Sequence, residues 1–171
     1  MTTKRVKKLI VHELPNDLDP AFYDAIGRVA AKWTLLEVRL QAIIWHYMGL
    51  DLKKGRVLTF GLTATSMLTL LETVPLRWIP DPGERAEVEA FADRADTLRK
   101  RRNDYVHGIW AVDPADPRKR VHLLYFNSGE RKIIAKRQHT QPKNVLALAN
   151  DIDALQTQVI AFLKRIGAKF V

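Results

Sequence analysis

The sequence predicts an all-α protein, a bundle of about five helices with a β-hairpin inserted before the last one. Three observations support this fold class. Long segments place apolar residues at alternating steps of three and four, the spacing of helices in a left-handed bundle. Glycine or proline stands at the ends of these segments. One short region instead carries two β-branched runs around a turn. The 171 residues are expected to form a single domain, 1–171.

The first helix is expected to begin after Asp19, because an aspartate N-cap is followed there by Pro20. It should run for about 28 residues and end at Gly49. Residues 1–15, basic and then β-branched, are expected to form an N-terminal arm or a short strand. The apolar positions at helical spacing are Ile26, Val29, Trp33, Leu36, Leu40, Ile43 and Tyr47.

Two shorter helices are expected next. Asp51 can cap a helix that ends near residue 60, and a third helix should cover about 66–79 with a bend at Pro75. The Pro-Asp-Pro-Gly sequence at 80–83 predicts a stop and a turn.

The fourth helix is expected over about 84–109, with glutamates in its first turns and arginines near its end, as the helix dipole favours. A loop is expected at 113–117. Two strand-like runs around Asn-Ser-Gly-Glu predict the hairpin near 121–136. The last helix should begin at Thr140 and end at Gly167.

The composition narrows the possible functions. The chain has 28 Lys and Arg against 19 Asp and Glu, a net charge of +9. This excess fits a polyanionic partner such as nucleic acid, and equally a solubilising surface charge. The absence of cysteine excludes disulfides, thiolate zinc sites and cysteine nucleophiles, and favours a reducing compartment. No stretch approaches the roughly 20 apolar residues that span a bilayer. A cytoplasmic protein without membrane contact is therefore expected.

Two charged residues interrupt apolar stripes. The stripe of the fourth helix predicts that position 102 faces the core, yet the residue there is Arg102. On the first helix, Glu37 lies between Trp33 and Leu40. A guanidinium at a core position costs several kcal/mol unless it is paired, so we expect Arg102 to face a cleft or a buried carboxylate. A pair with Glu37 is one hypothesis. A solvent-facing seam or a purely architectural ion pair is the alternative.

His107 follows Arg102 by five residues, and Asn103 shares a helix face with it. A histidine near a helix end often only contacts the last carbonyl groups. However, the sequence Arg-Asn-Asp-Tyr-Val-His at 102–107 resembles the motif of the HEPN superfamily (higher eukaryote and prokaryote nucleotide-binding domains), an arginine and a histidine with four to six residues between them.

The resemblance implies a helical bundle that forms a homodimer with the two motifs facing each other. Many HEPN proteins are metal-independent ribonucleases of toxin–antitoxin, phage-defence or RNA-processing systems. By similarity, Arg102 and His107 would form the active site with no cofactor and no metal, Asn103 would support them, and Glu37 would be the acidic residue of an earlier helix. The predicted hairpin is not part of the minimal family core.

The chemistry of these residue types fits RNA cleavage. The 2′-hydroxyl of RNA can attack the adjacent phosphate if a group that titrates near neutral pH moves a proton, and histidine is such a group. Arginine can stabilise the charge that builds on the phosphate oxygens. Cations near the motif are candidates for binding the RNA backbone. They are Arg99, Lys100, Arg101, Arg118, Lys119 and Arg120.

Two other functions remain open. One is a non-catalytic module that binds RNA or a nucleotide with the same residues. The other is a protein-interaction bundle, neutralised by an acidic, antitoxin-like partner. A DNA-binding regulator is less favoured, because no helix–turn–helix spacing is evident.

Overall fold

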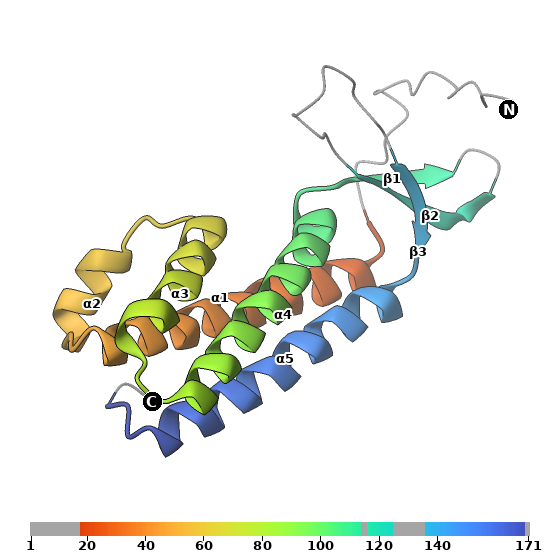
Figure 1. Ribbon diagram of the computed structural model, residues 1–171. Coiled ribbons are helices and arrows are strands. Elements are labelled where there is room, and N and C mark those ends of the chain that lie inside the picture. Colours follow the sequence, from red (N-terminus) through yellow and green to blue (C-terminus); the bar gives the residue numbers. More distant parts are fainter. Residues whose placement is uncertain (1–17, 114–115, 125–135, 170–171) are drawn as a thin grey trace, which may run out of the picture.

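The computed structural model describes residues 18–113, 116–124 and 136–169. The arm or strand expected at 1–15 lies outside these ranges. Figure 1 shows a bundle of long helices with a small sheet at one end, and the described residues form five helices. The predicted fold class is thus confirmed. None of these helices combines the length and apolar character needed to cross a bilayer.

Helix α1 (Pro20–Tyr47) has the predicted limits and its 28 residues. Asp19 caps it by accepting a hydrogen bond from the Ala21 N–H group at 2.9 Å. Its last turn is followed by Gly49 at a φ of 65°, a left-handed conformation that glycine adopts without steric cost. Local sequence signals therefore determine where the longest helix begins and where it ends.

Helices α2 (Leu52–Thr59) and α3 (Ala64–Trp78) also follow the prediction closely. Asp51 caps α2 by accepting from the Lys54 N–H group at 2.8 Å. Helix α3 begins two residues earlier than expected, because the Thr63 hydroxyl oxygen caps it by accepting from the Ser66 N–H group.

Helix α4 (Pro82–Val106) differs from the prediction at both ends. Asp81 accepts from the Glu84 N–H group at 2.8 Å, so the helix begins at Pro82 rather than at residue 84. It stops at Val106, because the chain leaves the helix at His107 and Ile109 already belongs to a strand. The apolar spacing at Ile109 continued the helical pattern by coincidence.

The described residues form a three-stranded antiparallel sheet in the region where a hairpin was expected. Strand β2 (Asp116–Leu124) lies between β1 (Ile109–Asp113) and β3 (Lys136–Thr140). Ile109 pairs with Leu123, and Arg120 pairs with Thr140. The prediction of a loop over 113–117 was wrong, because both ends of that segment are paired in the sheet. Residues 125–135, the centre of the expected hairpin, lie outside the described ranges.

The last helix, α5 (Pro142–Arg165), lies along α1 and α4 and completes the bundle (Figure 1). Helices α1 and α4 run in opposite directions. The Tyr47 hydroxyl at the end of α1 donates to Glu84 at the start of α4 at 2.6 Å, and the Phe22 ring at the start of α1 packs against Trp110, just beyond α4, at 5.1 Å. The carboxyl end of α4 is thereby held beside the first half of α1.

Candidate functional site

The end of α4 brings Arg102, Asn103 and His107 together. Nη1 of Arg102 lies 3.1 Å from Nε2 of His107 and 3.0 Å from Oδ1 of Asn103. His107 is the C-cap of the helix, and its backbone N–H group donates to the Asn103 carbonyl oxygen at 3.0 Å. The exposed imidazole can turn back to the arginine because the chain leaves the helix at this residue.

Trp33 of α1 supports the guanidinium of Arg102. The Arg102 Cζ atom lies 6.0 Å from the centre of the Trp33 ring, within the range of a cation–π contact. Trp33 is fully buried, so the position of Arg102 in the apolar stripe is explained by an aromatic surface under its charged group. From its helical spacing, Trp33 was expected only as a core residue. An aromatic residue one helical turn before Glu37 was the available signal.

The arginine is held with one donor unsatisfied. Its Nε atom is buried and makes no hydrogen bond. A buried donor without a partner costs about 1–3 kcal/mol. The buried Nε atom of Arg85 likewise makes no hydrogen bond, so this feature alone does not mark Arg102 as functional.

Glu37 lies near Arg102 but does not form the expected direct ion pair with it among the described contacts. Burial raises the pKa of the Glu37 carboxyl, while Trp33 and the positive charge of Arg102 act in the opposite direction. The indole N–H group of Trp33 favours the charged form of the Glu37 carboxyl. It does not meet the geometric criteria of a hydrogen bond. Helical periodicity indicated that Glu37 and Arg102 interrupt apolar stripes, but it could not predict that an aromatic ring supports the arginine.

The contact with Arg102 assigns a role to one ring nitrogen of His107. A guanidinium N–H group donates and never accepts. In this contact Nε2 of His107 is therefore the acceptor. In this arrangement the lone pair of Nε2 is occupied by the arginine.

The cations expected to bind RNA next to the motif have carboxylate partners. Arg99 and Lys100 contact the two oxygens of Asp96 at 2.7 and 2.6 Å, and Arg101 contacts Asp151 of α5 at 2.6 Å. The hydrogen bond from Lys100 is the main reason that the pKa of Asp96 is lowered. Such surface pairs are worth about 0–1 kcal/mol, so they hold the side chains only weakly. The other three candidates lie in β2, and their side chains are not described: Arg118, Lys119 and Arg120.

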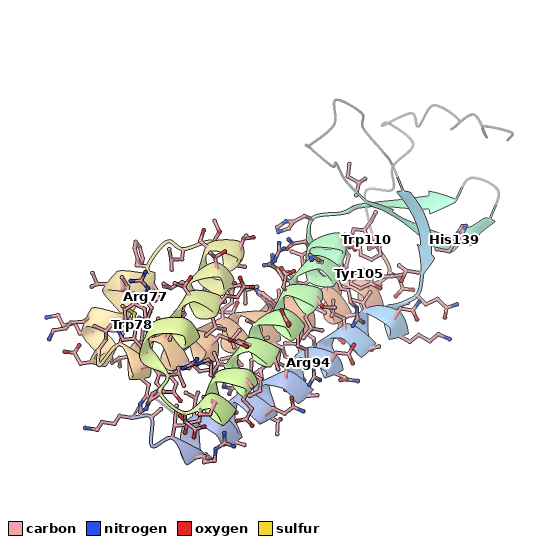
Figure 2. All side chains as sticks on the ribbon, viewed as in Figure 1. Arg77, Trp78, Arg94, Tyr105, Trp110 and His139 are labelled. Atoms are coloured by element: carbon pink, nitrogen blue, oxygen red, sulfur yellow. The ribbon has the colours of Figure 1, made fainter. Side chains whose placement is uncertain are left out.

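Aromatic contacts fasten the sheet to the motif. The Trp110 indole donates to the Tyr105 carbonyl oxygen at 3.1 Å, and the two rings stack 6.2 Å apart. Figure 2 shows both side chains between the end of α4 and β1. They flank His107 in sequence, so these contacts join the end of α4 to the first strand.

Comparison with known proteins gives no relative: no protein family, curated protein or solved structure matches this chain. Within the described residues, no group of three or more His, Asp or Glu side chains could hold a metal ion. The resemblance to HEPN proteins therefore rests on residues 102–107 and on the helical bundle.

Proposed function

We propose that the protein is a metal-independent endoribonuclease that acts as a homodimer, as the resemblance to HEPN proteins implies. The observation that carries the proposal is the 3.1 Å contact between Arg102 and His107 at the exposed end of α4. The contact supports the proposal because histidine is a residue type that transfers protons near neutral pH and arginine is one that binds phosphate. A toxin–antitoxin or phage-defence role is part of the same proposal, supported by the family resemblance alone.

In the proposed reaction, the Arg102 guanidinium binds the scissile phosphate and leaves His107 to do so. Nε2 of His107 then takes the proton of the 2′-hydroxyl as the 2′-oxygen forms a bond to phosphorus. The bond from phosphorus to the 5′-oxygen breaks, and that oxygen takes a proton from a protonated histidine, which the second copy's motif would supply. The products are a 2′,3′-cyclic phosphate and a 5′-hydroxyl group.

The neighbouring side chains support this role of Arg102. The Trp33 ring lies under the guanidinium, and Asn103 Oδ1 accepts one of its N–H groups, so the guanidinium has little freedom left to lose when it binds phosphate. We propose Glu37 as an acidic neighbour that favours the position of Arg102 through its charge, because its pKa responds to that arginine.

The test is cleavage of a labelled RNA in EDTA. His107→Ala should lower the rate by about 10²–10⁴-fold, the range for loss of a general acid–base group. Arg102→Lys, which keeps the charge but not the planar fork, should also lose activity. His46→Ala is the matched control, because His46 lies in the last turn of α1, about 20 Å along the helix from Trp33. Cleavage that survives His107→Ala would remove the proposal.

A protein-interaction module is the second candidate. The observation in its favour is that Arg102 already has bonding partners in Asn103 and His107, so these residues could serve only to seal the end of α4. In that case Arg102→Ala would unfold the protein and the wild type would release no RNA product. RNA binding that weakens steeply with salt, again without product, would favour a non-catalytic RNA-binding module.

A further inference from the structure

Large apolar side chains gather on the surface at the other end of the bundle from the motif. Val57 is 74% exposed and Phe60 is 89% exposed, and both belong to the segment of α2 and its following turn. Contiguous exposed apolar side chains mark interaction sites more often than isolated ones do. The exposed large apolar residues of this segment are Leu52, Val57, Leu58, Phe60 and Leu62.

The way α2 is attached to α1 forces this exposure. Gly55 packs so closely on the buried Trp45 that an added Cβ atom would lie 2.5 Å from its Cγ atom. One turn later, the buried Thr59 hydroxyl lies within hydrogen-bond distance of the Gln41 Oε1 atom and the Gly55 carbonyl oxygen, at 3.2 and 3.0 Å. Because Gly55 and Thr59 form the face that meets α1, the remaining side chains of this two-turn helix must point away from it.

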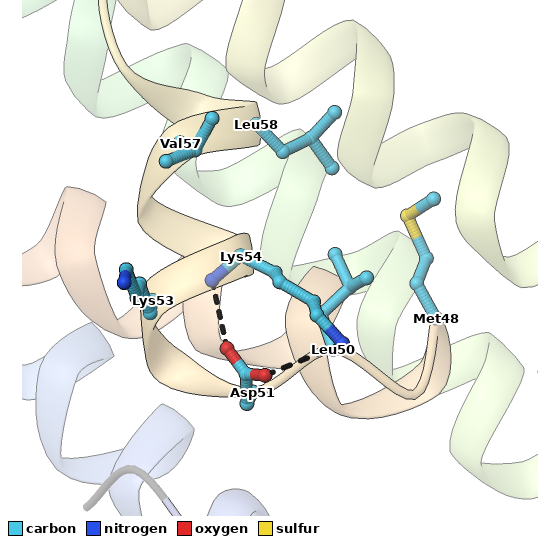
Figure 3. A pocket seen from close by; sticks show the side chains of 7 residues that line it. All are labelled: Met48, Leu50, Asp51, Lys53, Lys54, Val57 and Leu58. Carbon is cyan, nitrogen blue, oxygen red and sulfur yellow. Dashed lines mark hydrogen bonds and ion pairs between the residues drawn. The ribbon is translucent and has the colours of Figure 1, made fainter.

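An apolar groove of about 590 Å³ lies between the end of α1 and α2. Figure 3 shows its lining, with Asp51, Lys53 and Lys54 beside the apolar side chains. The volume is large enough for one or two apolar side chains of a partner. We call this feature the α2 groove; its apolar lining consists of Met48, Leu50, Val57 and Leu58.

The rim of the α2 groove is positively charged. Lys53 and Lys54 line the groove, against the single carboxylate of Asp51, and Arg56 is a further exposed cation of α2 outside this lining. The Asp51 carboxylate already has partners: it caps α2 and lies 3.5 Å from the Lys54 Nζ atom. The hydrogen bond from the Lys54 backbone is the main reason that the pKa of Asp51 is lowered. Within the described part of the chain, Lys53 and Arg56 have no carboxylate partner. A second copy of this surface would bring the same positive charge and be repelled.

We propose that the α2 groove binds an amphipathic helix of a partner protein that carries acidic residues beside its apolar side chains. An apolar side chain of the partner enters the groove, as in other helix-in-groove complexes. Its carboxylates meet Lys53, a lysine of the groove lining, which gives the charge complementarity that steers and orients a complex. This binding does not depend on the proposed ribonuclease activity. The groove lies where α1 ends and α2 begins, whereas Arg102 lies near the end of α4 and contacts Trp33, farther back along α1.

The experiment titrates the full-length protein into a fluorescently labelled synthetic helix that has Leu at positions i, i+3, i+4 and i+7 and Glu on its flanks. The control peptide has Lys in place of Glu. The Glu peptide should bind, more weakly as salt is added, and the Lys peptide should not. Val57→Asp should weaken binding by about tenfold or more, as should Lys53→Glu. Leu35→Asp is the matched control, because Leu35 is 52% exposed on α1 and does not line the groove.

Three results would overturn the proposal. The first is equal binding of the Lys and Glu peptides, or no binding of either. The second is self-association that Val57→Asp abolishes, since this would make a second copy the occupant. The third is co-sedimentation with phosphatidylserine vesicles that Val57→Asp abolishes while the Glu peptide does not bind, since the occupant would then be a lipid surface.

Discussion

Two glycines in helices should differ in how they respond to the same substitution by alanine. Gly27 lies in α1, and a Cβ atom added there meets nothing within 4 Å. Gly55 lies in α2, and a Cβ atom added there would come within 2.5–2.7 Å of three ring atoms of Trp45. Trp45 is a buried side chain that cannot move aside cheaply.

The magnitudes follow from these surroundings. Alanine in place of glycine within a helix stabilises by about 1 kcal/mol, and Gly27→Ala should gain about this amount. Gly55→Ala has the same gain but must also relieve an overpacked contact, which costs about 1–3 kcal/mol. The two variants should therefore differ in the free energy of unfolding by about 1–3 kcal/mol, with Gly55→Ala the less stable.

Urea unfolding followed by circular dichroism measures this difference. Because helix propensity is common to both variants, the comparison isolates the contact of Gly55 with Trp45. If Gly55→Ala were as stable as Gly27→Ala, the close packing of α2 on α1 would be refuted. The fixed outward direction of the α2 groove residues would be refuted with it.

Three further results are expected. Tyr47→Phe should lower the free energy of unfolding by about 0.5–1.5 kcal/mol, because it removes the hydrogen bond to Glu84, and urea unfolding would detect this. Glu37→Gln should be more stable than wild type at pH 7, because burial raises the pKa of Glu37 and penalises its charged form; unfolding at several pH values should show the gap closing as the pH falls through the raised pKa of Glu37 toward the ordinary carboxyl value of 4.5. Arg101→Ala should lower the free energy of unfolding by at most about 1 kcal/mol, since the ion pair with Asp151 is exposed. The same variant should reduce the salt dependence of RNA binding by about one phosphate contact, which filter binding at several salt concentrations would show.

The helices that could be predicted well are those with local signals at both ends. Asp19 with Pro20 defines the start of α1, and Gly49 defines its end. The end of α4 also carries a glycine, Gly108, but the apolar spacing continues past it to Ile109, which pairs with Leu123 in the sheet. Strand pairing depends on residues far apart in the chain, so the sheet could not be predicted from local patterns.

The candidate site was only partly predictable for a similar reason. The spacing of Arg102 and His107 near a helix end indicated that they lie close together. Their direct contact, however, depends on His107 leaving the helix as its C-cap and on side-chain rotation. The sequence showed that Glu37 and Arg102 were unusual in their stripes, but the position of the Trp33 ring under the guanidinium is a matter of tertiary packing.

The most direct test of the proposed ribonuclease compares two RNAs of the same sequence in EDTA, one unmodified and one with 2′-O-methyl groups throughout. If the 2′-hydroxyl is the nucleophile and His107 takes its proton, the wild type should cut the unmodified RNA to 2′,3′-cyclic phosphate ends. It should leave the methylated RNA intact, and His107→Ala should cut neither. Cleavage of the methylated RNA, ends other than cyclic phosphate, or no cleavage by the wild type would contradict the proposal.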